Sequence, residues 1–195
     1  MPRPLSIVDL GGTVRFWEAW GFDKEEDVRI TLINNHQRDT TNKHVQPSSP
    51  NIANISADAT QISDSFLEDF DLIFSNSFIE HLPGPLSQAA IATRIVNSGK
   101  PYFIQTPNKY SVLDPHFPRP YVPFFAAYPR RLQALLLTWT DLGSGCVSPS
   151  MEEAMRRLTY YHPLSLSDVR ELFPDAKLLL ERPMGVPMSI VALRR

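Results

Sequence analysis

The sequence predicts an α/β fold in which helices wrap a mostly parallel β-sheet. Two observations carry this prediction: strand-like runs recur along the chain, and helical patterns stand between several of them. Because parallel neighbours need a crossover connection, alternating strands and helices are typical of parallel sheets. The length of 195 residues is enough for one domain with a substantial core. We therefore expect residues 1–195 to fold as a single domain.

Seven segments have the apolar, branched composition of strands. They are residues 6–10, 28–33, 52–57, 71–75, 102–106, 176–182 and 188–193. After the first of them, the residues that follow Gly12 have a helical pattern. Two later helices have recognisable starts, because Ser150 with Glu153 and Ser165 with Asp168 have the spacing of a capping box.

The composition is that of a globular intracellular protein. Hydrophobic residues make up 43% of the chain and charged residues 21%, and the formal net charge is −2. With this balance, and without a long Lys/Arg tract, we expect no nucleic-acid partner. Cys146 is the only cysteine, which excludes a disulfide within the chain. No signal peptide is visible and no apolar stretch approaches the ~20 residues that span a membrane, so a cytoplasmic location is expected.

Two segments depart from the regular alternation. Residues 34–51 are polar and almost free of large apolar residues, so we expect a long, mobile loop there. Residues 107–150 begin with a stretch rich in proline and aromatic residues, and its prolines forbid a continuous helix. Because so many aromatic side chains must pack somewhere, we expect residues 107–150 to be an insert that covers a ligand pocket.

The first strand ends in an aspartate and a pair of glycines, in the sequence LSIVDLGGT. Glycines allow a turn to approach a ligand closely, although an ordinary strand-to-helix turn has the same residues. A dinucleotide site would need G-x-G-x-x-G and an acid about 20 residues further on. Gly11 and Gly12 lack that spacing, and the second strand ends in Asn34 and Asn35. A nicotinamide cofactor is therefore not expected.

Four motifs follow the predicted strands in order: DLGGT after the first, SADAT after the third, FDLIFSNSFIEHL at the fourth and YFIQTPNKY at the fifth. As an ordered set they resemble the class I S-adenosylmethionine-dependent methyltransferases, most closely the methyltransferase type 11 group. The resemblance covers most of the chain and is strongest over residues 5–81. It implies a Rossmann-like methyltransferase fold, with a seven-stranded, mostly parallel sheet, an antiparallel last strand and helices on both faces. It also implies S-adenosyl-L-methionine as the cofactor.

The resemblance assigns roles to residues at the strand ends. Asp9 matches the acid that helps hold the methionine part of the cofactor, and Gly11 and Gly12 let the backbone approach it. Asn34 stands where the family usually has an acid that bridges the ribose hydroxyls, which an amide can bond without charge assistance. Asp58 matches the residue whose carboxylate accepts from the adenine amino group, and Ala59 supplies a backbone N–H beside it. Ser75 and Asn76 stand at the end of the fourth strand, where the ligand crevice opens.

Two features depart from the family pattern. Thr13 and Arg15 stand where the fuller first motif has glycines. The chain also begins at the first strand, whereas many relatives have preceding helices that help close the cofactor site. These departures favour a second interpretation, a non-catalytic binding or partner subunit with the same fold.

Two histidines are candidate general bases for an acceptor hydroxyl. His116 lies in the sequence LDPHFPRPY, within the expected cover, where Asp114 could orient its ring. His81 follows Glu80 just past the fourth strand. Structural roles are open for both: His116 as a surface-loop residue, and the Glu80–His81 pair as an anchor for the following turn.

The sequence thus predicts methyl transfer to a small-molecule acceptor, with an oxygen nucleophile favoured over nitrogen. A non-catalytic subunit is one alternative, and a nucleic-acid methyltransferase, which the charge balance disfavours, is another. No metal site is expected, because His36, His44 and His162 show no metal-ligand spacing. The identity of the acceptor and the formation of a homodimer are left open.

Overall fold

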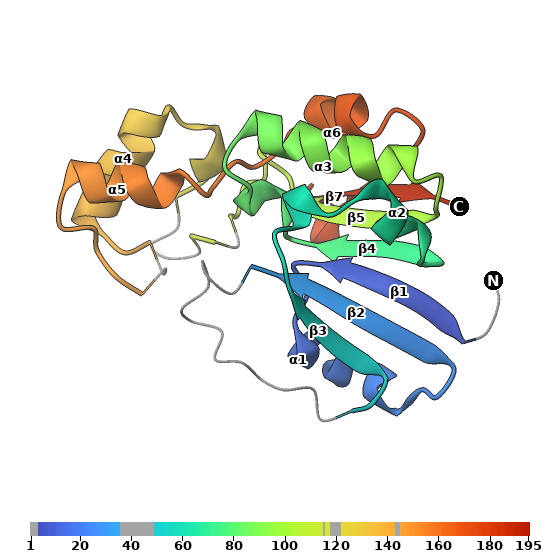
Figure 1. Cartoon of the computed structure of the whole chain (residues 1–195). Helices are drawn as coiled ribbons and strands as arrows, with labels where there is room; N and C mark the ends of the chain where they lie inside the picture. Colours follow the sequence, from blue (N-terminus) through green and yellow to red (C-terminus); the bar gives the residue numbers. More distant parts are fainter. Residues whose placement is uncertain (1–3, 36–48, 115, 118–121, 143–144) are drawn as a thin grey trace.

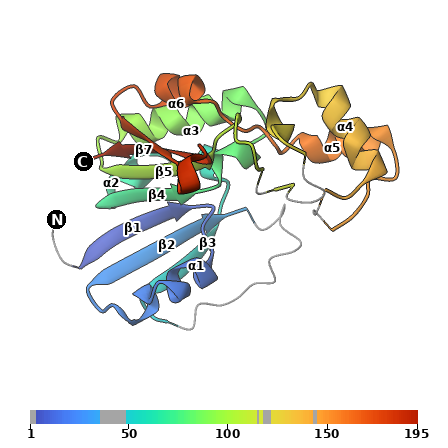
Figure 2. The same cartoon turned by 180° about the vertical axis from the view of Figure 1, so that it is seen from behind.

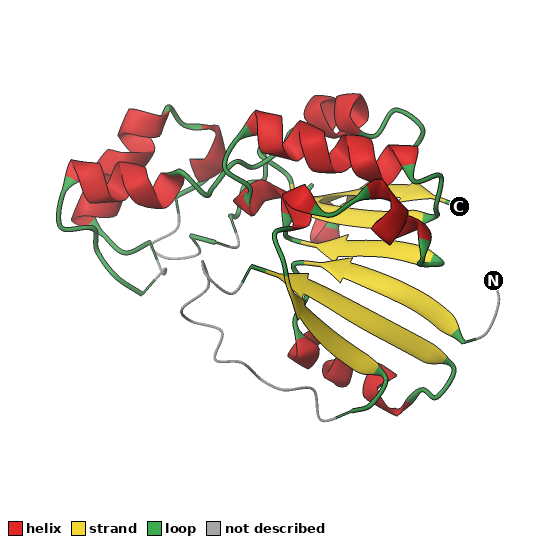
Figure 3. Cartoon of the chain, viewed as in Figure 1, coloured by secondary structure: helices red, strands yellow, loops and turns green. Residues whose placement is uncertain are grey.

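The computed structural model describes residues 4–35, 49–114, 116–117, 122–142 and 145–195. Its strands form one seven-stranded sheet in the order β3-β2-β1-β4-β5-β7-β6 (Figures 1 and 3). The strands are β1 Leu5–Leu10, β2 Val28–Asn34, β3 Ile52–Ser56, β4 Leu72–Asn76, β5 Tyr102–Pro107, β6 Lys177–Glu181 and β7 Ser189–Arg194. β7 is antiparallel to both of its neighbours, β5 and β6, and the other neighbouring pairs are parallel. The predicted sheet, with its antiparallel last strand, is confirmed.

Each face of the sheet buries its own apolar cluster, because successive residues of a strand point to opposite faces. In β1, Ile7 belongs to the cluster beneath α1, whereas Val8 and Leu10 belong to the cluster shared with α2, α3 and α6. Figures 1 and 2 show this grouping of the helices on the two sides of the sheet. The helices are α1 Val14–Ala19, α2 Asp64–Glu68, α3 Pro85–Asn97, α4 Arg130–Trp139, α5 Met151–Leu158 and α6 Leu166–Leu172. Within the described ranges, no helix has both the length and the apolar character needed to cross a membrane.

Polar side chains define the starts of several helices, because they satisfy N–H groups that have no partner inside the helix. The hydroxyl of Thr13 caps α1. Ser150 accepts a hydrogen bond from the N–H of Glu153 at the start of α5, and Ser165 and Asp168 form a reciprocal capping box before α6. Both helix starts predicted from the sequence are confirmed.

The helices α4 and α5 form a pair with an apolar cluster of its own. Ala134 and Leu137 of α4 pack with Ala154 and Leu158 of α5, and Tyr161 belongs to the same cluster. Figure 1 shows this pair beyond the carboxyl ends of β4 and β5. The unit extends past residue 150, the predicted end of the insert, and residues 115, 118–121 and 143–144 of that insert lie outside the described part of the chain. A covering role for the insert stays a prediction.

The winding of the sheet reverses between β1 and β4. β2 and β3 lie on one side of β1, whereas β4 and β5 lie on the other. In open parallel sheets a ligand binds outside the carboxyl ends of the strands at such a reversal. The topology therefore directs attention to the residues that follow β1 and β4.

The far end of the predicted polar loop is anchored to the segment before β2. Residues 36–48, which make up most of that loop, lie outside the described residues. The side-chain amide of Asn51 donates to the carbonyls of Phe22, Glu25 and Val28, at 2.8, 3.0 and 3.1 Å. These bonds set the point at which the chain enters β3.

Candidate active site

Asp9 is a buried carboxylate at the carboxyl end of β1. It is 1% exposed, and its Oδ2 accepts a hydrogen bond from the indole Nε1 of Trp17 at 2.8 Å. Its Oδ1 has no hydrogen-bond partner among the described residues. Burial raises the pKa of Asp9 to about 7, against the opposing effect of the Trp17 hydrogen bond. The free oxygen can accept one more hydrogen bond, and a cationic donor would favour the ionised form.

The two glycines after Asp9 are required by side chains of the protein itself. A Cβ on Gly12 would lie 1.8 Å from Oδ2 of Asp9. Gly11 has a φ of +79°, and a Cβ there would lie 2.3 Å from a ring carbon of Phe78. From the sequence, these glycines suit either the approach of a ligand or an ordinary strand-to-helix turn, and no sequence signal indicates their contacts with Asp9 and Phe78. Phe78 brings the segment after β4 against the turn after β1.

Three further predicted cofactor residues lie at the carboxyl ends of β2 and β3. The side-chain amide of Asn34 donates to the carbonyl of Gly12 at 2.9 Å, which ties the end of β2 to the glycine turn. Oδ1 of Asp58 accepts from the N–H and the hydroxyl of Thr60, at 2.9 and 2.7 Å. Asp58 thereby caps the short 3-10 helix η2 Ala59–Gln61, in which Ala59 is buried. Asn34 and Asp58 therefore also have local structural roles.

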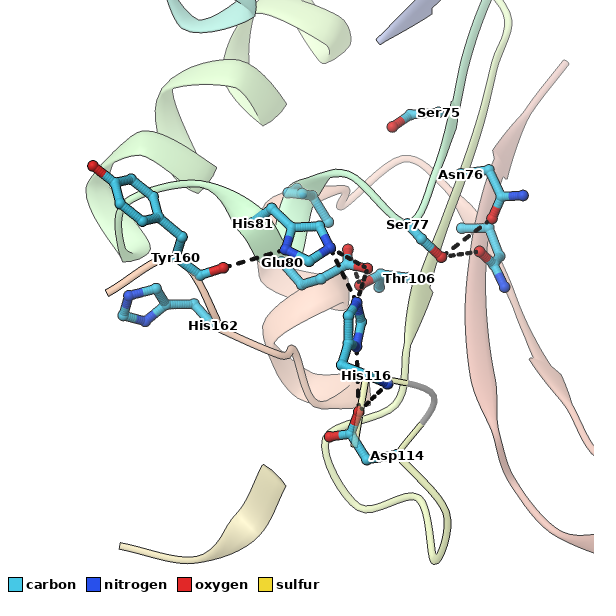
Figure 4. A network of polar contacts seen from close by, with 12 residues as sticks. Ser75, Asn76, Ser77, Glu80, His81, Thr106, Asp114, His116, Tyr160 and His162 are labelled. Carbon is cyan, nitrogen blue, oxygen red and sulfur yellow. Dashed lines mark hydrogen bonds and ion pairs between the residues drawn. The ribbon is translucent and has the colours of Figure 1, made fainter. Parts of the chain in front are cut away.

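The predicted residues of β4 differ in their surroundings. Ser75 is buried, and its hydroxyl donates to the carbonyl of Leu10 at 3.1 Å, so it fastens β4 to the end of β1. The side-chain oxygen of Asn76 accepts from the hydroxyl of Ser77 at 3.4 Å. Figure 4 shows Ser75 apart from the polar network that follows the strand.

The two candidate bases, His81 and His116, lie together in one polar cluster (Figure 4). Their Nε2 atoms are 3.0 Å apart. Glu80 lies beside both rings, with its Oε1 at 4.0 Å from Nε2 of His81 and 3.9 Å from Nε2 of His116. Its Oε2 accepts from the hydroxyl of Thr106 in β5 at 3.0 Å, and Nδ1 of His116 lies 3.2 Å from Oδ1 of Asp114. We call these five residues the histidine cluster.

The histidine cluster holds its ionisable groups in unequal environments. Burial raises the pKa of Glu80 to about 7. Burial and the neighbouring His116 lower the pKa of His81. Burial also lowers the pKa of His116, but the hydrogen bond with Asp114 and the charges of Asp114 and Glu80 outweigh it, so the net pKa is raised. His116 is therefore the better proton acceptor of the two rings.

A second set of contacts fixes the backbone beneath the histidine cluster. The N–H of His162 donates to the carbonyl of Glu80 at 2.7 Å, and the amide of Gln88 donates to the carbonyl of His162 at 2.8 Å. Nη2 of Arg130, in α4, lies 2.9 Å from Nδ1 of His162. These contacts connect the short 3-10 helix η3 Ile79–His81 to the α4–α5 unit. No sequence signal indicated them, because the residues lie far apart along the chain.

The burial of the Asp9 carboxylate is expected to make the free energy of unfolding depend on pH. Because the folded pKa of Asp9, about 7, exceeds its usual 3.8, the folded state binds the proton more tightly, and its stability falls as the pH rises through this window. A pKa difference of this size corresponds to about 4 kcal/mol. Asp9→Asn mimics the protonated form, so we expect the variant to gain up to about 4 kcal/mol of unfolding free energy relative to the wild type between pH 4 and pH 8.

Urea denaturation at a series of pH values measures this gain. Asp64→Asn, at a half-exposed carboxylate that pairs with Arg94, is the matched control and should show little such gain. Equal pH dependence in the wild type and in Asp9→Asn would contradict the assigned environment of Asp9.

Comparisons with known proteins give matches among solved structures. No protein-family model matches the chain, and no curated protein sequence matches it. An S-adenosylmethionine-dependent methyltransferase from Mesorhizobium loti is 14% identical, with a TM-score of 0.57 over 100% of this chain and 94% of that one. Human N-acetylserotonin methyltransferase, in complex with S-adenosylmethionine, is 13% identical, with a TM-score of 0.54 over 98% of this chain and 48% of that one.

A third solved structure, the O-methyltransferase NcsB1 from neocarzinostatin biosynthesis, holds S-adenosylmethionine and 2-hydroxy-5-methyl naphthoic acid. It is 15% identical, with a TM-score of 0.50 over 96% of this chain and 48% of that one. The chain thus spans about half the length of several structures that it matches. The strand order and these similarities show that the chain has the fold of the class I S-adenosylmethionine-dependent methyltransferases.

Proposed function

We propose that this protein transfers a methyl group from S-adenosylmethionine to a hydroxyl oxygen of a small-molecule acceptor. The observation that carries this proposal is the contact between the two halves of the candidate site. Phe78 lies against Gly11 of the β1 turn, and Glu80 and His81, which follow Phe78 closely in the chain, belong to the histidine cluster. A buried acid and a set of proton acceptors therefore follow the two strands that flank the reversal of the sheet, where such folds bind ligands.

The residues at the ends of β1, β2 and β3 fit the cofactor. When bound, the cofactor supplies a methyl group on a positively charged sulfur. The free Oδ1 of Asp9 can accept from the ammonium group of the amino-acid part. Asn34 can bond the ribose hydroxyls, and the carboxylate of Asp58 can accept from the adenine amino group beside the N–H of Ala59. Ser75 and Asn76, at the end of β4, are the remaining residues predicted to bind the cofactor.

The histidine cluster fits an acceptor that must lose a proton. An acceptor hydroxyl becomes a good nucleophile as its proton leaves, and His116 is the ring whose pKa is raised. Asp114 orients that ring through Nδ1. NcsB1 and the human enzyme, whose names describe methyl transfer with hydroxylated or aromatic ligands, support an acceptor of that kind. The net charge of −2 speaks against a nucleic-acid acceptor.

A non-catalytic subunit of the same fold is the second candidate. It is favoured by the ring of Phe78, which fills the space beside Gly11 that a ligand would approach. Saturable cofactor binding without transfer to any hydroxylated acceptor would support this candidate.

The proposed function requires the folded chain to bind S-adenosylmethionine and its product S-adenosylhomocysteine. We expect both to give saturable heats in calorimetry and to raise the melting temperature, because a ligand selective for the folded state stabilises it.

Asp58→Asn keeps an oxygen for the N–H of Thr60 but places an amino group toward the adenine. Loss of a hydrogen bond to a charged acceptor costs about 1.5–3 kcal/mol, so affinity should fall roughly 10- to 150-fold.

Asp69→Asn, at an exposed carboxylate that ends α2, is the control for Asp58→Asn and should bind as the wild type does. Absence of any melting shift at saturating ligand would remove the cofactor from the proposal. Unchanged affinity in Asp58→Asn would show that the adenine lies elsewhere.

A further inference from the structure

We propose that Glu80, His81 and His116 bind one divalent transition-metal ion of the zinc class. Each residue contributes one ligand atom, namely Oε1 of Glu80 and the Nε2 atoms of the two histidines. Imidazole nitrogen and carboxylate oxygen are ordinary zinc ligands. The sequence did not indicate this site, because His116 lies 35 residues after His81 and is brought to it only by the fold.

The three ligand atoms have the spacing that a zinc ion needs. They are separated by 3.0, 3.9 and 4.0 Å. A point equidistant from all three lies about 2.1 Å from each, which is within the usual zinc–nitrogen and zinc–oxygen range of about 2.0–2.2 Å. That point lies in the plane of the three atoms. Tetrahedral angles need ligand separations of about 3.4 Å, so the two longer separations must shorten and the separation of the Nε2 atoms must lengthen, each by about half an ångström.

The hydrogen bonds of the two rings leave both Nε2 atoms as acceptors. Nδ1 of His81 faces the carbonyl of Tyr160 at 3.2 Å, and Nδ1 of His116 faces the carboxylate of Asp114 at 3.2 Å. Both partners accept, so each Nδ1 carries the hydrogen of its neutral ring. Two lone pairs then face each other across 3.0 Å, an arrangement that a metal ion or a shared proton between them would stabilise.

Glu80 supplies a second, independent indication of a cation. Its side chain is fully buried, and Oε1 has no hydrogen-bond partner in the part of the chain that the structure describes. Thr106 holds the other oxygen, so Oε1 is turned toward the two rings. A buried carboxylate oxygen without a partner is costly, and coordination of an ion would satisfy it.

The hydrogen-bond acceptors of the two histidine rings and the exposure of His81 agree with a metal site that solvent can reach. A histidine that binds a metal usually donates its other N–H to a carboxylate or a carbonyl, as His116 and His81 do here with Asp114 and Tyr160. The side chain of His81 is 43% exposed, which gives an ion a route from solvent. Three protein ligands leave a fourth position for an oxygen donor, such as water.

The place of the metal site in the fold suggests that the acceptor hydroxyl can occupy the fourth coordination position of the ion. Glu80 and His81 follow β4, and Thr106 lies near the end of β5, on the acceptor side of the proposed crevice. This consequence rests on the proposed function: an acceptor hydroxyl bound to the ion would lose its proton to solvent more readily, and the ion would then replace Nε2 of His116, which it occupies, as the group that activates the hydroxyl. Metal binding itself does not depend on it.

Calorimetry of the full chain with ZnCl₂, after dialysis against a chelator, tests the site without cofactor or acceptor. A Cys146→Ser background removes the exposed thiol as a competing ligand. We expect one Zn²⁺ per chain. His116→Ala and Glu80→Gln should each weaken binding about 100-fold or more, and Asp114→Asn, which acts through His116, about 10- to 100-fold. A His36→Gln, His44→Gln double variant is the control for adventitious histidine binding and should keep full affinity.

Cobalt substitution supplies a second measurement on the unmutated ligands. We expect Co²⁺ to give the intense visible absorption of a four-coordinate site and to be displaced by Zn²⁺. The proposal would be overturned if Zn²⁺ at about a tenfold excess gave no saturable binding, or if His116→Ala and Glu80→Gln left the binding unchanged. A proton shared between the two rings would then explain their short separation. Methyl transfer that persists in a variant unable to bind Zn²⁺ would overturn only the role of the ion in the reaction. Zn²⁺ binding without any cofactor binding would overturn the proposed function alone.

Discussion

Replacing His116 with alanine is expected to lower the turnover number on a hydroxyl acceptor by about 10²–10⁴-fold, the usual size of a general-base contribution. Affinity for S-adenosylmethionine should change little, because His116 lies in the histidine cluster and not at the ends of β1 to β3. The atom that matters is Nε2, which either takes the acceptor proton or holds the proposed ion. Steady-state kinetics and calorimetry on the same preparation separate the two effects.

The choice of acceptor and control makes the His116 test specific. An acceptor that is already acidic needs little help, so the loss should shrink as the acceptor pKa falls. His36→Gln, in the polar segment 34–51 of the sequence, is the control and should retain turnover. Full activity of His116→Ala at every pH tested would make His116 a structural residue, and Glu80 with His81 would become the next pair to test.

The sheet could be predicted because each strand carries its own signal. Runs such as 28–33 and 102–106 are apolar enough to be buried, and the segments that separate the first five strands are too long for hairpins. The observed β2 and β5 differ from those ranges by no more than one residue at an end. The antiparallel last strand was implied by the methyltransferase resemblance, and the pairing of β7 with β5 and β6 confirms it.

The candidate site was predictable residue by residue but not as an arrangement. His81 and His116 were separate candidates, since no local pattern shows that a loop after β5 returns to the segment after β4. Ring contacts and the carboxylates of Glu80 and Asp114 bring them together in the folded chain. The start of α5 was predicted from its capping pattern, but α4 and its packing against α5 were not, because the prolines and aromatic residues before α4 suggested only an irregular cover.

The glycine turn shows how a correct residue can have an incomplete explanation. Gly11 and Gly12 were attributed to the approach of a ligand, a role that a sequence can suggest by analogy. The structure gives them a role in folding, because the carboxyl group of Asp9 and the ring of Phe78 occupy the space of a Cβ. Such a requirement depends on contacts across the turn, and no pattern of spacing reveals it.

Gly12→Ala is expected to be the most destabilising single change at the turn, by about 3 kcal/mol or more. Its Cβ would lie 1.8 Å from Oδ2 of Asp9, so the carboxyl group must move away from Nε1 of Trp17. Overpacking of a core costs about 1–3 kcal/mol, and the loss of a hydrogen bond to a charged acceptor adds about 1.5–3 kcal/mol. Urea denaturation of the variant against the wild type measures the sum.

A double-mutant cycle with Asp9→Ala separates this clash from a general intolerance of alanine at the turn. Asp9→Ala alone leaves Nε1 of Trp17 without its acceptor, but it also vacates the space that the methyl group added by Gly12→Ala would enter. The double variant should therefore be more stable than the sum of the single changes implies, with a coupling energy of about 1–3 kcal/mol. Gly21→Ala is the matched control. Its φ is +76°, and apart from its chain neighbours no atom of the described residues lies within 4 Å of the added Cβ. Backbone strain alone should therefore act and should add to Asp9→Ala without coupling. Simple additivity of Gly12→Ala and Asp9→Ala would mean that the carboxyl group does not occupy this space, and the packing of Asp9 beneath the turn would have to be abandoned.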